Sequence, residues 1–180
     1  RSAGLCVALK ITGDTADSNA VIDMGLIRPK LAQLNKPINV HVNRHDPALD
    51  REAALINRRI PASKEFIANN YINETIYNPI KKEIGIVAVG KAATETIDAF
   101  DTIGIVSPEQ KGIGIFKCKV PWPLINQEII KFCRGYKEIV VIEEKAGIVE
   151  EQIAHILFND EKRPLQSGKI DAVSNEPLIP

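Results

Sequence analysis

The second half of the sequence repeats one pattern three times: a short apolar stretch followed by a segment with amphipathic helical periodicity. The apolar stretches are 84–90, 112–120 and 138–145. They are rich in Val, Ile and Gly, which is typical of strands in a parallel sheet that is covered on both faces. Alternating strands and helices predict an α/β fold with three layers and a mostly parallel open sheet.

The segment after each apolar stretch places apolar side chains on one helical face and polar side chains on the other. The predicted buried faces are Ala93, Ile97 and Phe100, then Ile125, Ile129, Phe132 and Cys133, then Val149, Ile153, Ile156 and Leu157. Residues 163–172 predict a final edge strand. We therefore expect one α/β domain over residues 81–180.

Residues 1–80 are less regular and predict a linker segment that contains a pair of helices. Short extended stretches are expected at 20–24 and 38–42, and residues 74–77 fit either a strand or a connector. The chain begins at Arg1 in the middle of an apolar pattern, so we expect a piece of a longer protein.

The helical pair is predicted from its capping residues and its prolines. Asp46 is the predicted N-cap of the first helix, with Pro47 in its first turn. Leu49, Ala53 and Ile56 then share one apolar face. Because Pro61 disfavours helical geometry at the preceding residue, the first helix is expected to end there and a second one to begin, with Phe66 and Ile67 on its buried side.

Composition excludes several classes of protein. The 180 residues carry a formal net charge of zero without clustered Lys or Arg, which argues against nucleic-acid binding. The longest uncharged apolar stretch, 84–90, is too short to span a membrane. Cys6, Cys118 and Cys133 form no CxxC pair, and we interpret them as buried, reduced thiols of a cytoplasmic protein.

Residues 85–91 match G-x-x-x-x-G-K by letter, but they do not predict a phosphate-binding loop. The four residues between the glycines are the predicted strand itself, and Ala92 stands where a magnesium-binding Ser or Thr is needed. A weaker interpretation stays open. Gly90 and Lys91 lie between a parallel strand and a helix, where a helix N-terminus can accept an anion.

Two further groups of residues follow predicted strands. Glu143, Glu144 and Lys145 end the third strand, at the sheet edge where ligands bind in open α/β folds. They fit either a ligand or partner contact or a helix cap with a solvated neighbour. Trp122, between two prolines, fits either an interface anchor or a cover for its own core. No nucleophilic triad can be assembled from the serines and histidines.

Several segments in register resemble the large subunit of indolepyruvate:ferredoxin oxidoreductase, a thiamine-diphosphate-dependent 2-oxoacid:acceptor oxidoreductase. The similar segments are SAGLCVALKITGDTADSNAVID, PALDREAALINRRIPASKEFIANN, GIVAVGKAATETIDAF, VPWPL, IVVIEEKAGIVEEQIAHILFN, and RP, GK and EPLIP near the end. The resemblance implies that residues 81–180 are a transketolase C-terminal-like domain. It also implies that residues 1–80 are the linker from the pyrimidine-binding domain.

The resemblance implies a parent enzyme that oxidatively decarboxylates aryl 2-oxoacids to acyl-coenzyme A, with thiamine diphosphate, magnesium and iron–sulfur clusters. This chain departs from that whole, because it has neither a Gly-Asp-Gly motif nor a cysteine-rich cluster motif. We therefore expect a non-catalytic structural or assembly domain that binds no cofactor itself. The positions that match the family, as contact or architectural residues, are Gly90, Lys91, Trp122, Glu143, Glu144 and Lys145.

Two alternatives remain at this point. The chain is also consistent with a free-standing α/β module that binds a small ligand or nucleotide near Gly90 and Glu143. It is equally consistent with a partner-binding subunit whose first forty residues become ordered on the partner. In the favoured interpretation the partners are other domains or subunits of the parent oxidoreductase, with no nucleic acid and no membrane.

Overall fold

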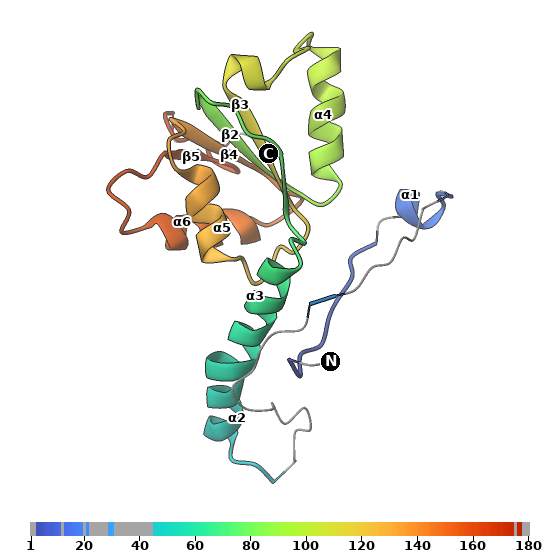
Figure 1. The fold of residues 1–180 in the computed structure, drawn as a ribbon, viewed down its shortest axis with the longest axis vertical. Coiled ribbons are helices and arrows are strands. Elements are labelled where there is room, and N and C mark those ends of the chain that lie inside the picture. Colours follow the sequence, from blue (N-terminus) through green and yellow to red (C-terminus); the bar gives the residue numbers. More distant parts are fainter. Residues whose placement is uncertain are drawn as a thin grey trace. The chain divides into compact units, whose positions relative to one another are not determined.

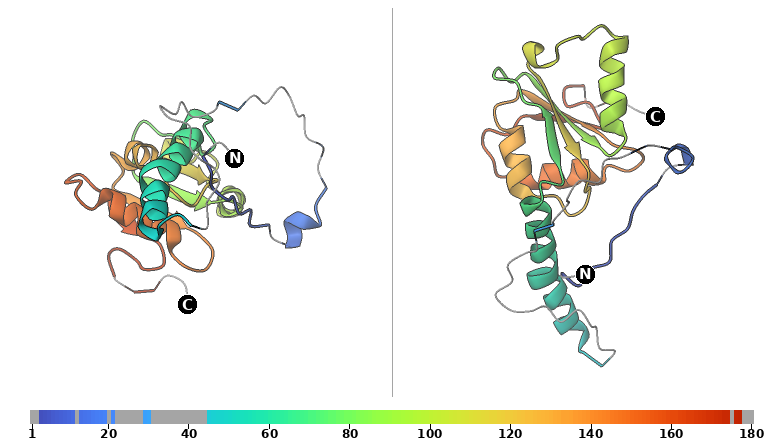
Figure 2. Two further views of the ribbon diagram at one scale, coloured as in Figure 1. Left: turned by 90° about the horizontal axis from the view of Figure 1, so that it is seen from below. Right: turned by 45° about the vertical axis from the view of Figure 1, so that its right-hand side comes forward.

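The computed structural model describes residues 3–11, 13–19, 21, 29–30, 45–174 and 176–177. The chain divides into two compact units, Arg1–Asn70 and Tyr71–Pro180 (Figures 1 and 2). The extended stretches predicted at 20–24 and 38–42 lie outside the described residues, apart from residue 21.

One long helical segment dominates the described part of the first unit. It consists of α2 (Ala48–Ala54), a π-helical turn η1 (Leu55–Arg59) and α3 (Ile60–Asn69), without a break. The predicted interruption at Pro61 is therefore wrong. The wider π turn shifts the hydrogen-bond pattern just before the proline, which then falls in the first turn of α3, where a backbone N–H is not needed. A short helix, α1 (Gly13–Ala16), precedes this segment.

Two further expectations about this segment are wrong. The N-cap position of α2 is Pro47 rather than Asp46, and no side-chain hydrogen bond caps the helix. Leu49 and Ile56, from the predicted apolar face, are 77% and 54% exposed. In α3, by contrast, Ile67 is buried as expected.

The second unit is built on a five-stranded sheet with the order β1-β3-β2-β4-β5. Its strands are β1 (Glu74–Tyr77), β2 (Ile84–Val89), β3 (Ile113–Cys118), β4 (Glu138–Ile142) and β5 (Leu165–Ser167). All pairs are parallel except β1 with β3. The α/β class and the mostly parallel sheet are therefore confirmed, and the final edge strand is β5.

Helices cover both faces of this sheet, which gives the three layers. Helix α4 (Ala92–Thr102) lies on one face, and α5 (Asn126–Cys133) and α6 (Ile148–Leu157) lie on the other (Figure 1). A short 3-10 turn, η2 (Glu109–Lys111), leads into β3. Each helix follows the strand that the sequence pattern assigned to it.

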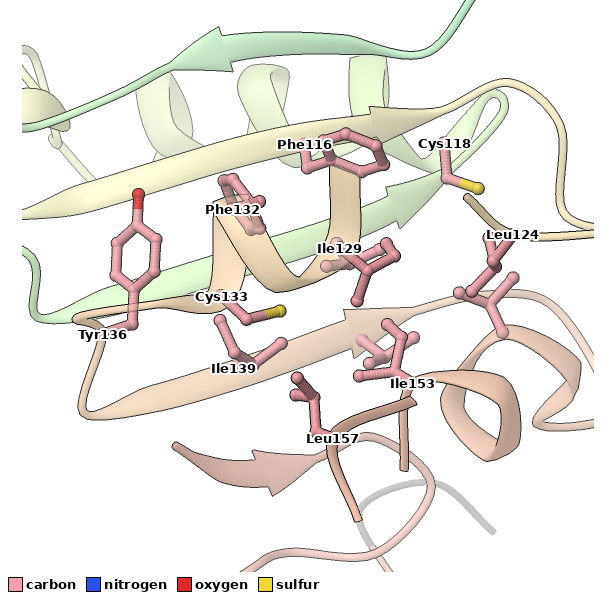
Figure 3. Close-up of a cluster of buried hydrophobic side chains, with 13 residues drawn as sticks. Phe116, Cys118, Leu124, Ile129, Phe132, Cys133, Tyr136, Ile139, Ile153 and Leu157 are labelled. Carbon is pink, nitrogen blue, oxygen red and sulfur yellow. The ribbon is translucent and has the colours of Figure 1, made fainter. Parts of the chain in front are cut away.

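The core consists of one cluster on each face of the sheet. Alternation along β2 separates them, since Ile86 and Ala88 pack with α4 whereas Val87 packs with α5 and α6. Buried residues of the larger cluster include Phe116, Ile129, Phe132, Ile139, Val149 and Ile153 (Figure 3). Burial of both faces explains why these strands are continuously apolar.

Candidate functional site

The six residues singled out in the sequence all follow parallel strands at one edge of the sheet. Gly90 and Lys91 follow β2, Trp122 follows β3, and residues 143–145 follow β4. Strands β2 and β4 are neighbours, yet β2 leads to α4 on one face and β4 leads to α6 on the other. This divergence is a topological switch point, the position where open α/β sheets bind ligands.

The β2–α4 connection is tight and bends through a glycine. Gly90 has a φ of +57°, which favours glycine, and a Cβ added there would meet no atom within 4 Å. Its N–H donates to the Cys118 carbonyl at 2.9 Å, which joins the ends of β2 and β3. Lys91 is the N-cap residue of α4, and its Nζ lies 3.1 Å from the Glu95 carboxylate.

Glu143 caps the helix that follows it. Its carboxylate accepts hydrogen bonds from the backbone N–H groups of Val149 and Glu150 at 2.9–3.1 Å. These donors belong to the first turn of α6, where N–H groups lack partners within the helix and a negative charge is favoured. The structure therefore supports the capping interpretation of Glu143.

The neighbours of Glu143 are placed differently. Glu144 and Lys145 are both exposed, and Lys145 has a left-handed φ of +62°. The Lys169 side chain, from the segment after β5, donates to the Glu143 carbonyl at 2.5 Å. The β4–α6 connection is thus fixed at Glu143 and presents the next two side chains to solvent.

The β3–α5 connection carries Trp122, which is 57% exposed. The peptide bond between Trp122 and Pro123 is cis. Asn73 accepts hydrogen bonds from the N–H groups of Lys119 and Val120, at 3.0 and 3.1 Å. Gln152 accepts one from the Leu124 N–H at 3.1 Å and donates one to the Pro121 carbonyl at 2.8 Å.

Sequence reasoning missed both Asn73 and Gln152. Asn73 is only 8% exposed although it is polar, which marks it as a residue with a fixed hydrogen-bonding role. No local pattern signals this role, because its partners are more than forty positions away in sequence. Gln152 lies within an amphipathic helix, where a polar residue is unremarkable by itself.

The chemistry available at this edge is limited. Cys118 is buried, and burial, followed by the nearby charges of Glu143 and Glu128, raises the pKa of its thiol to about 12. It is therefore a neutral thiol and a poor nucleophile at ordinary pH. Within the described ranges, no group of three or more His, Cys, Asp or Glu side chains is arranged to hold a metal ion. In the same ranges, no helix is long and apolar enough to cross a membrane.

The expected cofactors of a parent enzyme do not fit the residues of this chain. Magnesium and an iron–sulfur cluster both need several convergent carboxylate or thiolate ligands. Cys118 and Cys133 are separately buried in the core, and the described cysteines are all free. We therefore derive no reaction step through such a group.

The fold and this edge define a class of protein: a doubly wound α/β domain with its loops gathered at the carboxyl ends of parallel strands. The family model for the indolepyruvate oxidoreductase domain matches residues 75–180, which cover the whole sheet. The chain therefore belongs to the indolepyruvate oxidoreductase domain family. A comparison with curated proteins found no match.

Two solved structures are similar to the chain at low identity. A split-gene transketolase, described as an inactive β4 tetramer, is 16% identical with a TM-score of 0.42, over 53% of this chain and 31% of that one. The 2-oxoglutarate:ferredoxin oxidoreductase from Magnetococcus marinus, with 2-oxoglutarate, coenzyme A and succinyl-CoA bound, is 16% identical with a TM-score of 0.39. That match covers 71% of this chain and 21% of the other. The chain thus spans less than a third of either protein.

Proposed function

We propose that this chain is a non-catalytic structural and assembly domain of a cytoplasmic, indolepyruvate-type 2-oxoacid:ferredoxin oxidoreductase. The parent enzyme oxidatively decarboxylates aryl 2-oxoacids to acyl-coenzyme A and uses thiamine diphosphate, magnesium and iron–sulfur clusters held elsewhere. The observation that carries this proposal is the family match over residues 75–180. The unreactive buried thiol and the use of Glu143 as a helix cap also support it.

In this proposal the carboxyl edge of the sheet contacts neighbouring domains or subunits of the parent enzyme. The contact residues are Gly90, Lys91, Trp122, Glu143, Glu144 and Lys145. Trp122 is the expected anchor, because a large exposed indole on a fixed loop loses little conformational freedom when it binds. Glu143 contributes through the loop that it holds in place.

A complementation assay tests the proposal. The 180-residue chain is assayed with indolepyruvate, coenzyme A, thiamine diphosphate, magnesium and ferredoxin, alone and together with the remainder of the parent enzyme. We expect no turnover by the chain alone and turnover when the two parts are combined. Turnover by the chain alone would refute the non-catalytic role.

Two aromatic variants test the contact surface in the same assay. Trp122→Ala should weaken complementation at least tenfold, the loss of about 1.4 kcal/mol that is the lower range for an interface anchor. Phe158→Ala is the matched control, because Phe158 is 69% exposed and lies at the other end of α6. Equal complementation by both variants would refute Trp122 as the anchor.

A further inference from the structure

We propose that Asn73 and Gln152 are positioning residues that hold the segment 119–125 from both sides and thereby fix the exposed Trp122. For its purpose this inference rests on the proposed contact role of Trp122. The fixation itself does not depend on any partner. We call the two side chains the amide clamp.

The first half of the amide clamp acts on the residues before Trp122. A single oxygen of Asn73 accepts both the Lys119 and the Val120 N–H, at 3.0 and 3.1 Å. The amide nitrogen of Asn73 donates to the Glu128 carboxylate at 2.9 Å. Because a carboxylate only accepts hydrogen bonds, Glu128 fixes the orientation of the amide, and the oxygen faces the loop.

The second half acts on both sides of Trp122 from helix α6. Gln152 accepts from the Leu124 N–H at 3.1 Å, while its nitrogen donates to the carbonyls of Pro121 at 2.8 Å and Ile148 at 3.0 Å. The amide therefore uses its acceptor and both donors. Ile148, which is 54% exposed, is tied to the same side chain.

The two halves leave one prominent side chain free to reach solvent. Residues 119, 120, 121 and 124 are each held through a backbone group, and Leu124 is 2% exposed. Trp122 stands between these fixed points. Preorganisation of this kind lowers the entropic cost of binding, which suits a contact loop.

Trp122 is the only tryptophan in the sequence, so its fluorescence reports on this loop directly. In the free 180-residue chain we measure the fluorescence anisotropy of Trp122 and the amide hydrogen exchange of Lys119, Val120 and Leu124. Asn73→Ala should raise exchange at Lys119 and Val120 about fivefold to tenfold, the typical effect of a lost hydrogen bond. Gln152→Ala should do the same at Leu124, and both should lower the anisotropy.

Matched controls separate this local effect from a general loss of stability. Asn159→Ala and Gln127→Ala make the same chemical changes at exposed positions and should leave all these readings unchanged. If Asn73→Ala fails to fold, Gln152→Glu serves instead. A Glu oxygen still accepts from the Leu124 N–H but cannot donate to Pro121, so anisotropy should fall while exchange at Leu124 stays slow.

Wild-type anisotropy and exchange in folded Asn73→Ala and Gln152→Ala would overturn the amide clamp. So would a uniform rise in exchange across the sheet, which would indicate only a structural role. Neither result bears on the complementation assay. A failed clamp and a failed assembly role are therefore distinguishable.

Discussion

The hydroxyl of Tyr136 lies directly above the backbone of Gly114, so that a Cβ added at residue 114 would come within 1.8 Å of the hydroxyl oxygen. Gly114 is paired with Gly85 across β2 and β3, and a Cβ at Gly85 would meet the tyrosine ring at 2.9 Å. The paired glycines thus leave a notch in the sheet that the ring fills (Figure 3). This packing makes both glycines structurally necessary.

Gly114→Ala should lower the free energy of unfolding by about 3 kcal/mol, because the added methyl group overpacks a rigid site. Adding Tyr136→Phe should restore part of the loss, since it removes the oxygen at 1.8 Å but leaves the ring carbon at 2.8 Å. Urea unfolding measures all three variants. Gly13→Ala, where an added Cβ meets no atom within 4 Å, should be neutral. A Gly114→Ala variant of wild-type stability would contradict the notch.

Tyr136→Phe alone should leave stability unchanged or raise it by up to about 1 kcal/mol. In the part of the chain that the structure describes, the buried Tyr136 hydroxyl has no hydrogen-bond partner. Burial is also the main cause that raises its pKa to about 12. Removing an unpaired buried hydroxyl relieves a desolvation cost of roughly 1–3 kcal/mol, against which the lost packing is small. A loss above about 1 kcal/mol in urea unfolding would show that the hydroxyl is satisfied after all.

The three cysteines should differ sharply in reactivity. Cys6 is exposed, whereas Cys118 and Cys133 are buried, so the expectation of buried thiols is confirmed for two of the three. Burial raises the pKa of both buried thiols to about 12. We expect a thiol reagent at neutral pH to label one cysteine in the native chain and all three in denaturant. Rapid native labelling of Cys118 or Cys133 would contradict this burial.

The same two thiols should make the chain less stable at alkaline pH. Their folded pKa of about 12 lies above the ordinary value of 9.0, so between these values the unfolded chain releases protons that the folded chain retains. Their stabilising contribution is complete below pH 9 and declines as the pH rises towards 12. Urea unfolding across this window should show a steeper decline for wild type than for Cys118→Ala/Cys133→Ala. Parallel curves would contradict the assignment.

The sequence predicted the sheet well because its signals are local. Continuous apolar stretches and helical periodicity located β2, β3, β4 and the helices between them. The helix through Pro61 was misjudged because a π turn is a tertiary accommodation with no sequence pattern. The exposure of Leu49 was missed for a related reason, because periodicity indicates a face but not what covers it.

The candidate site was only partly predictable. Positions after strand ends follow from the topology, so Gly90, Trp122 and Glu143 could be expected at one edge of the sheet. Which of two plausible roles Glu143 takes depends on the turn that brings its carboxylate back to the N–H groups of α6. The contribution of Asn73 depends on contacts with residues far away in sequence, which single-sequence reasoning cannot locate.

Lys82→Met should lower the free energy of unfolding by about 1–2 kcal/mol. The Lys82 ammonium donates to the carbonyls of Phe132 and Arg134, at 3.2 and 3.0 Å, and lies 4.6 Å from the centre of the Tyr136 ring. It thus satisfies carbonyls at the C-terminus of α5, where a cation is favoured. Methionine keeps most of the apolar stem but donates no hydrogen bond. Lys162→Met, at an exposed position, should be neutral in the same urea titration.

Glu143→Ala should lower the free energy of unfolding by about 1–2 kcal/mol, because it leaves the first N–H groups of α6 without their acceptor. Glu143→Gln should lose less, since one amide oxygen still accepts but the favourable charge at the helix N-terminus is gone. Glu161→Ala, which removes an exposed carboxylate beyond the end of α6, controls for the change in net charge. Urea unfolding provides the free energies, and amide exchange at Val149 and Glu150 locates the loss. If Glu143→Ala keeps wild-type stability and slow exchange at these two amides, the cap contributes nothing. A direct partner-contact role for Glu143 would then be the better explanation of its position.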